Sequence, residues 1–315
     1  MKHSALASLV FNRALVKARY PALFLAVLSG FMGPLGFAPF HMPGLIFLSL
    51  AIFYSVLLPA TVGQSLILGF VYGLGFFGLG VSWVIFSIHD YGQMNYISSG
   101  LITLLFICYL SLYPSLLAYC FYWLKSDKKP IYSMMGFAAL WCISEYLRSH
   151  LMTGFPWLLV GTTQIDTPLK YLAPLLGIYG LSFITLFASA LLYYALKQAS
   201  FYKRSLFLAS FVMIIISPAL LKPWAWTQQS EETISIGAVQ GNLSMRDKWD
   251  DALFWKLLKY YEKSTNSLLG RQLIIFPESA IPLPARYLTQ YLSRLHHKAL
   301  DANSAILLGI LHPSD

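Results

Sequence analysis

Long apolar segments follow one another through the first 221 residues, and they constrain the fold more than any other feature. A helix that crosses a bilayer needs about 20 apolar residues, because each residue adds about 1.5 Å across a hydrocarbon core about 30 Å thick. Seven segments meet this need, at approximately 22–39, 43–60, 62–88, 97–124, 131–149, 171–197 and 205–221. The sequence therefore predicts a polytopic α-helical membrane domain with seven transmembrane helices over residues 1–230.

The charged residues divide the chain near Ser230. Residues 1–230 contain only four acids, whereas residues 231–315 contain nine acids and nine bases. The net charge of +9 therefore belongs to the membrane part, where it indicates orientation in the bilayer and not nucleic-acid binding. Residues 231–315 form a second domain with the composition of a soluble protein.

Lysine and arginine gather in alternate loops of the membrane part. The N-terminal segment and the loops at 125–129 and 197–204 contain ten of these bases, whereas the intervening loops contain Arg148 and Lys170. The positive-inside rule then places the N-terminus in the cytoplasm. Seven crossings bring residues 231–315 to the far side, which is the periplasm if the protein lies in a bacterial inner membrane.

Strand and helix patterns alternate in residues 231–315. Apolar runs at 234–239, 273–276 and 306–311 have the composition of strands, and the segments 249–269 and 287–300 have helical spacing. This alternation predicts a parallel sheet covered by helices, with a functional site at the carboxyl ends of the strands. Glu278 follows the second run directly and is the candidate catalytic carboxylate.

Several short motifs give the chain a specific resemblance to a known protein family. They are Phe37-Ala38-Pro39-Phe40, Gly78 to Val84, Gly154-Phe155-Pro156-Trp157, Val239-Gln240-Gly241-Asn242 with Lys248-Trp249, and Phe276-Pro277-Glu278-Ser279-Ala280-Ile281-Pro282. In order and spacing the chain resembles the apolipoprotein N-acyltransferase family, whose soluble domain is a nitrilase-like (carbon–nitrogen hydrolase) αββα sandwich. Residues 231–315 resemble the N-terminal part of that domain. Thr162 and Thr163 depart from the aromatic-containing loop that is usual in the family.

The resemblance implies a covalent acyl transfer without a cofactor. A Glu-Lys-Cys triad takes a fatty acyl chain from a phospholipid, with phosphatidylethanolamine expected, and forms a thioester. The acyl group then passes to the diacylglyceryl-cysteine of an apolipoprotein. Glu278 matches the proton acceptor of this triad, and Trp249 is the candidate contact for the acyl chain. The sequence contains no metal-ligand cluster and no phosphate-binding glycine loop.

The lysine and cysteine of the triad have no match in the chain. The resemblance places them after the third strand, close to where this sequence ends. The cysteines present, Cys108, Cys120 and Cys142, lie within apolar segments and are interpreted as small packing residues. We therefore expect the chain to be C-terminally truncated relative to the family and inactive by itself.

Two other functions stay open. The chain is either a non-catalytic lipid-binding remnant of the family or a membrane-anchored amidase of the nitrilase class. The acyltransferase interpretation is favoured because the membrane motifs match as well as the soluble ones.

Three features of the membrane part have structural interpretations. Glu145 and Arg148 are spaced i, i+3 and either pair with one another, which is preferred, or bind a lipid headgroup. Gly69 and Gly73 form a small face for close helix packing. Trp157 is interpreted as an interfacial anchor.

Overall fold

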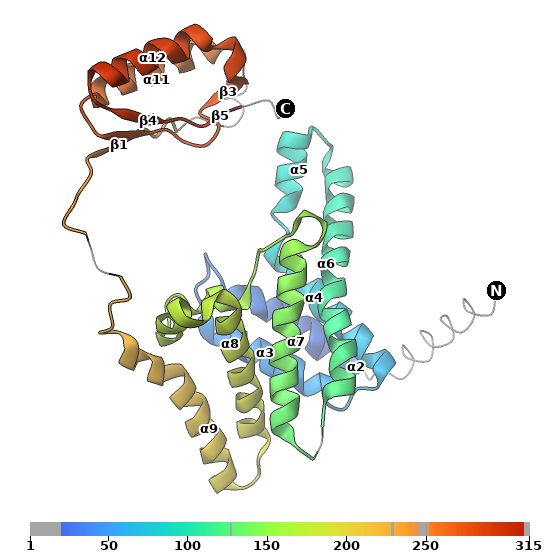
Figure 1. The fold of residues 1–315 in the computed structure, drawn as a ribbon. Coiled ribbons are helices and arrows are strands. Elements are labelled where there is room, and N and C mark those ends of the chain that lie inside the picture. The colour runs from blue at the N-terminus through green and yellow to red at the C-terminus, as the bar shows by residue number, and fades with distance from the viewer. Residues whose placement is uncertain are drawn as a thin grey trace. The chain divides into compact units, whose positions relative to one another are not determined.

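The computed structural model describes residues 20–126, 128–227, 230–242, 244, 250 and 252–311. The chain divides into two compact units, Met1–Trp226 and Thr227–Asp315. The first unit is helical, and the second combines helices with short strands (Figure 1).

The described part of the first unit is built from α-helices joined by short loops and 3₁₀ turns. The helices are α2 (Tyr20–Met32), α3 (Pro43–Leu57), α4 (Val62–Gly80), α5 (Val84–Gly92), α6 (Tyr96–Leu124), α7 (Pro130–His150), α8 (Ala173–Lys197) and α9 (Phe201–Ile216). Four helical stretches are long and apolar enough to cross a membrane, namely Val62–Gly80, Tyr96–Leu124, Pro168–Lys197 and Phe201–Leu221, and Tyr20–Gly36 and Pro43–Leu57 are shorter apolar ones. The chain is therefore a multi-pass membrane protein, and the number of seven crossings stays a prediction.

The segment expected as one helix over 62–88 is two helices. Helix α4 ends at Gly80, and α5 begins at Val84. A Cβ atom on Gly80 would lie 2.3 Å from a methyl carbon of Leu158, so the loop after α7 occupies the space beside the end of α4. Helix α5 has no buried residue and packs beside the N-terminal part of α6 (Figure 1). The apolar run therefore continues through a break that hydropathy does not reveal.

Helices α4 and α6 pack closely across the glycine face. Cβ atoms on Gly69 and Gly73 would lie 2.3 Å from the carbonyl oxygen of Pro114 and 2.7 Å from the Cα atom of Ser111. Any side chain at these positions would therefore separate the two backbones. The expectation that this small-residue face serves helix packing is confirmed.

The second unit contains a parallel sheet in the strand order β1-β2-β4. Its strands are β1 (Ile236–Ala238), β2 (Leu273–Ile275) and β4 (Ala305–Leu307), with Ile236, Leu273 and Ala305 in register. The parallel pairing expected from the sequence is confirmed. A second parallel pair, β3 (Ile281–Pro284) with β5 (Ile310–Leu311), was not expected, because its strands are too short to show a pattern.

Helices α11 (Phe254–Leu268) and α12 (Thr289–Asp301) cover one face of the sheet (Figure 1). Ile274 points into the core beneath them and is fully buried. On the neighbouring strands, Ile236 and Leu307 are 49% and 60% exposed. Because successive strand residues point to opposite faces, these side chains belong to the face that the two helices do not cover.

Candidate functional site

The turn from β2 to β3 presents Glu278 at the carboxyl edge of the sheet. Before the turn, the backbone N–H of Phe276 donates to the carbonyl oxygen of Leu307 at 2.9 Å, and the Phe276 ring is buried against Tyr261. After it, the N–H of Ile281 donates to the carbonyl oxygen of Gly309 at 3.3 Å. The turn is thus held at both ends while Glu278 remains exposed. The expected position of this carboxylate at a strand end is confirmed.

Gly309 supports the turn from the loop that follows β4. A Cβ atom at this position would lie 2.6 Å from both the carbonyl oxygen of Pro277 and the backbone nitrogen of Ser279. Only glycine allows this approach without moving the backbone that carries Glu278. Ser279 has a positive φ of 45°, so the turn also bends sharply just after the carboxylate.

The neighbouring strand β1 ends at the same edge. The backbone N–H of Val239 donates to the carbonyl oxygen of Ile275 at 2.9 Å, which brings the Val239–Gln240 segment beside the start of the turn. The hydroxyl of Tyr260 on α11 donates to the carbonyl oxygen of Gln240 at 3.3 Å. Trp249, the expected contact for an acyl chain, lies outside the described residues, and its role stays a prediction.

Arg148 and Glu145 in the first unit do not pair, and the sequence interpretation was wrong on this point. The Arg148 guanidinium donates through Nη1 to the carbonyl oxygen of Phe155 at 2.7 Å and to that of Trp157. Its Nη2 donates to the carbonyl oxygen of Leu158 at 3.4 Å. One buried cation therefore binds three carbonyl groups of the loop that follows α7.

Glu145 binds the same loop from the same helix. Its Oε1 atom accepts the backbone N–H of Val160 at 2.7 Å and the indole N–H of Trp141 at 3.0 Å. Glu145 and Arg148 are only 3% and 4% exposed, so neither side chain can reach a lipid headgroup. The loop supplies carbonyls to the cation and an N–H to Oε1 of the carboxylate, so it binds both charged side chains, while Oε2 of Glu145 is buried without a hydrogen-bond partner in the described part of the chain. We call Glu145 and Arg148 together the loop clamp.

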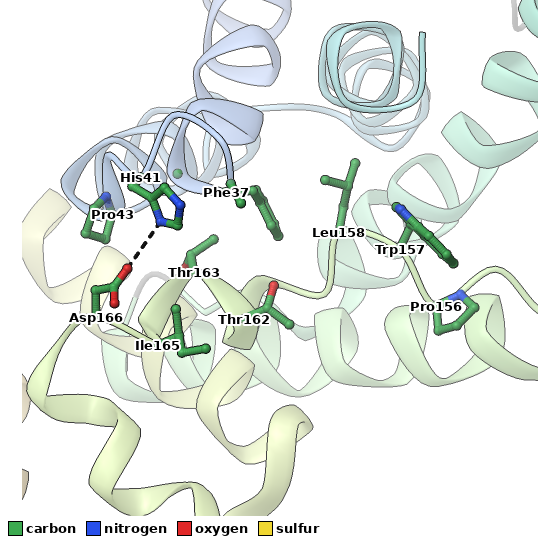
Figure 2. A pocket seen from close by; sticks show the side chains of 12 residues that line it. Phe37, His41, Pro43, Pro156, Trp157, Leu158, Thr162, Thr163, Ile165 and Asp166 are labelled. Carbon is green, nitrogen blue, oxygen red and sulfur yellow. Dashed lines mark ion pairs between the residues drawn. The ribbon is translucent and has the colours of Figure 1, made fainter. Parts of the chain in front are cut away.

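Beside this loop lies an open pocket of about 530 Å³ (Figure 2). One wall comes from the connection between α2 and α3, and the other from the connection between α7 and α8. The lining residues are Gly36, Phe37, Ala38, His41, Pro43, Pro156, Trp157, Leu158, Thr162, Thr163, Ile165 and Asp166. His41 Nδ1 lies 3.2 Å from Asp166 Oδ2, with the two side chains 55% and 62% exposed. This pair joins the two walls at a solvent-accessible position.

Sequence reasoning missed this pocket, because its walls are 120 residues apart in the chain. A signal was available, since Asp166 is one of only four acids in residues 1–230 and His41 directly follows the Phe37–Phe40 motif. Trp157 is 51% exposed, and its ring lies 6.0 Å from that of Trp83, which is 42% exposed. Among the described residues, no group of three or more His, Cys, Asp or Glu side chains could hold a metal ion.

Known proteins resemble the chain along most of its length. Apolipoprotein N-acyltransferase of Coxiella burnetii is 36% identical over 287 residues, which are 91% of this chain and 59% of the relative. The proteins of the same name from Pseudomonas syringae and Azotobacter vinelandii are each 34% identical to this chain over 95% of its length. The matched segments make up 59% and 58% of those two proteins. The chain thus spans somewhat more than half the length of these relatives.

A family model describes the membrane part. The model of the apolipoprotein N-acyltransferase N-terminal domain matches residues 29–191, just over half of the 315 residues. This range contains the loop clamp and both walls of the pocket. The chain therefore belongs to the apolipoprotein N-acyltransferase family.

Proposed function

We propose that the chain is part of an enzyme that N-acylates the diacylglyceryl-cysteine of bacterial apolipoproteins, with a phospholipid as acyl donor. The observation that carries this proposal is the turn that holds Glu278 exposed at the carboxyl edge of a parallel sheet, in a chain of this family. A carboxylate at such a place can accept and return a proton. The second unit is then the opening part of a nitrilase-like αββα domain.

In the proposed reaction Glu278 takes the proton of a cysteine thiol, and the thiolate attacks the ester carbonyl of the phospholipid. A lysine stabilises the oxyanion, and the lysophospholipid leaves with the proton returned by Glu278. The α-amino group of the acceptor then attacks the thioester, Glu278 accepts the proton of the amine, and the thiol forms again as the amide is made. Phosphatidylethanolamine is the expected donor, and Trp249 the expected contact for its chain.

The proposed location is the bacterial inner membrane, with residues 231–315 in the periplasm. Two connections that the charge bias predicts to be external, 37–42 and 151–172, meet at the pocket. Two regions predicted to be cytoplasmic also meet, because Lys125 Nζ donates to the carbonyl oxygens of Leu58 and Ala60 at 2.7 Å and 2.6 Å. This pairing of loops supports the alternating topology.

The function is tested with a chimera, because residues 231–315 contain no cysteine. The chimera joins this chain to the remaining length of the Coxiella burnetii relative. With phosphatidylethanolamine and a diacylglyceryl-peptide, mass spectrometry should detect the triacylated peptide. Glu278→Gln should abolish the product, because an amide cannot accept the thiol proton, whereas Glu262→Gln on helix α11 should retain it. A folded chimera without product would refute the function, and an active Glu278→Gln chimera would refute the role of Glu278.

A further inference from the structure

Helix α11 carries a row of three lysines on the side that faces away from the sheet (Figure 1). Its buried side chains, among them Leu258 and Tyr261, belong to the core of the second unit. Lys256, Lys259 and Lys263 are exposed, and their spacing of three and four residues places them one after another along the opposite side of the helix. We call these three residues the lysine ridge.

The charges of the lysine ridge are not offset within the helix. The one carboxylate of α11, Glu262, accepts a hydrogen bond from Lys298 of α12 at 2.8 Å. The ion pairs found among the described residues do not include a lysine of the ridge. Like charges at i and i+4 destabilise a helix, so the ridge by itself lowers the stability of α11. Residues 231–315 contain nine acids and nine bases, so the ridge is a local excess of positive charge.

Exposed aromatic rings lie beside the lysine ridge. Trp255 is 69% exposed and directly precedes Lys256, and Tyr260 is 43% exposed and directly follows Lys259. Basic side chains together with tryptophan or tyrosine are typical of helices at a membrane–water interface, where the bases meet phosphates and the rings lie among the headgroups. This surface of α11 therefore has the chemistry that fits an anionic lipid surface.

The connection to α9 keeps the second unit close to a bilayer. The apolar stretch Phe201–Leu221 ends one residue before the connection, and residues 222–235, which lead to β1, span at most about 50 Å when extended. Trp224 and Trp226 at its start have stacked rings 6.2 Å apart and are 68% and 47% exposed, as is typical of an interface. A lipid surface is thus present at high local concentration, whereas an acidic protein must first be recruited.

We propose that the lysine ridge docks the second unit on an anionic phospholipid surface, with its ammonium groups at the lipid phosphates and Trp255 among the headgroups. Helix α11 begins at the carboxyl edge of the sheet, where the hydroxyl of Tyr260 donates to the carbonyl oxygen of Gln240. Docking of its first turns therefore also brings the edge that carries Glu278 toward the lipids. Such docking needs no acyl transfer.

The experiment uses the full 315-residue chain in nanodiscs of phosphatidylcholine, alone or mixed with phosphatidylglycerol. A fluorophore on Ser267→Cys, an exposed position one turn beyond Lys263, is quenched by lipids with a nitroxide on the headgroup, and serine replaces the native cysteines. Quenching should be stronger with phosphatidylglycerol, because each lysine near an anionic surface favours docking about fivefold. At about 1 M salt the Debye length falls to about 3 Å, and the difference should disappear.

Two double variants separate the lysine ridge from the total charge. Lys259→Gln with Lys263→Gln should lower the ratio of docked to free protein about 25-fold, which returns quenching to the level in phosphatidylcholine. Arg271→Gln with Arg286→Gln removes the same charge from exposed positions outside α11 and should retain the quenching. Helical circular dichroism verifies folding, since glutamine and lysine have similar helix propensities.

Three outcomes would overturn the proposal. The first is quenching of the native chain that does not respond to phosphatidylglycerol, and the second is an equal loss of quenching in the two double variants. The third is a fluorophore that responds to added polyglutamate but not to phosphatidylglycerol, which would assign the lysine ridge to an acidic protein. Acyl transfer by the chimera is measured separately, so either result can fail without the other.

Discussion

Replacement of Arg148 by lysine tests whether the loop clamp holds the loop after α7. Lysine keeps the positive charge near Glu145 but replaces the planar fork of donors by a single ammonium group. The native guanidinium binds the carbonyl oxygens of Phe155, Trp157 and Leu158 at once. A lysine side chain is shorter and cannot reproduce three contacts from one position, so at least one of these carbonyls loses its charged donor.

The expected cost follows from these contacts. A hydrogen bond to a charged group contributes about 1.5–3 kcal/mol, so the loss of one such bond destabilises the first unit by about that amount. For a unit of about 200 residues each kcal/mol lowers the melting temperature by about 2–4 °C, which gives a decrease of about 3–12 °C. Arg204→Lys is the matched control, because Arg204 is exposed and both of its contacts go to the carbonyl oxygen of Gln198.

Thermal unfolding of the full chain in detergent measures this cost, and chymotrypsin reports the state of the loop. Arg148→Lys should melt earlier and be cleaved faster after Trp157, which is followed by Leu158. Arg204→Lys should change stability by less than about 0.5 kcal/mol, as surface substitutions usually do. Equal melting temperatures for the two variants, with unchanged cleavage of the loop, would show that the clamp does not hold it.

Two predictions concern the second unit. Gly309→Ala should displace the turn that carries Glu278 and lower acyl transfer by the chimera. Gly44→Ala is the control and should retain the activity, because a Cβ at Gly44 meets nothing within 4 Å. Equal activities of the two variants would refute this prediction. Lys298 donates to Glu262 at 2.8 Å and lowers the pKa of this carboxyl group. The pair therefore stabilises the second unit at pH values above about 4.3, the ordinary carboxyl pKa. This stabilisation is lost as the pH falls through the lowered pKa of Glu262 in the folded protein. Glu262→Gln should lower the free energy of unfolding by less than about 1 kcal/mol at pH 7 and leave it unchanged at pH values below the lowered pKa of Glu262. Thermal unfolding at several pH values measures this difference.

Patterns that depend on near neighbours in the sequence were predicted well. The parallel strands β1, β2 and β4 followed from short apolar runs between helical segments, and the strand-end position of Glu278 followed from its place after the second run. The glycine face of α4 was predicted because small residues at i and i+4 share one side of a helix. Each of these inferences uses only the periodicity of a helix or strand.

Contacts between distant segments were not predicted. Spacing on α7 suggested a pair between Glu145 and Arg148, but in the structure each binds a loop whose path no local pattern describes. At the break between α4 and α5, Gly80 lies against Leu158, which is nearly 80 residues away in the sequence. The sequence by itself determined the membrane class, the family resemblance and the candidate base, because apolar length and short motifs are local properties. Only the tertiary structure decided the partners of the buried charges and the pocket at His41 and Asp166, because both depend on which distant backbone groups meet.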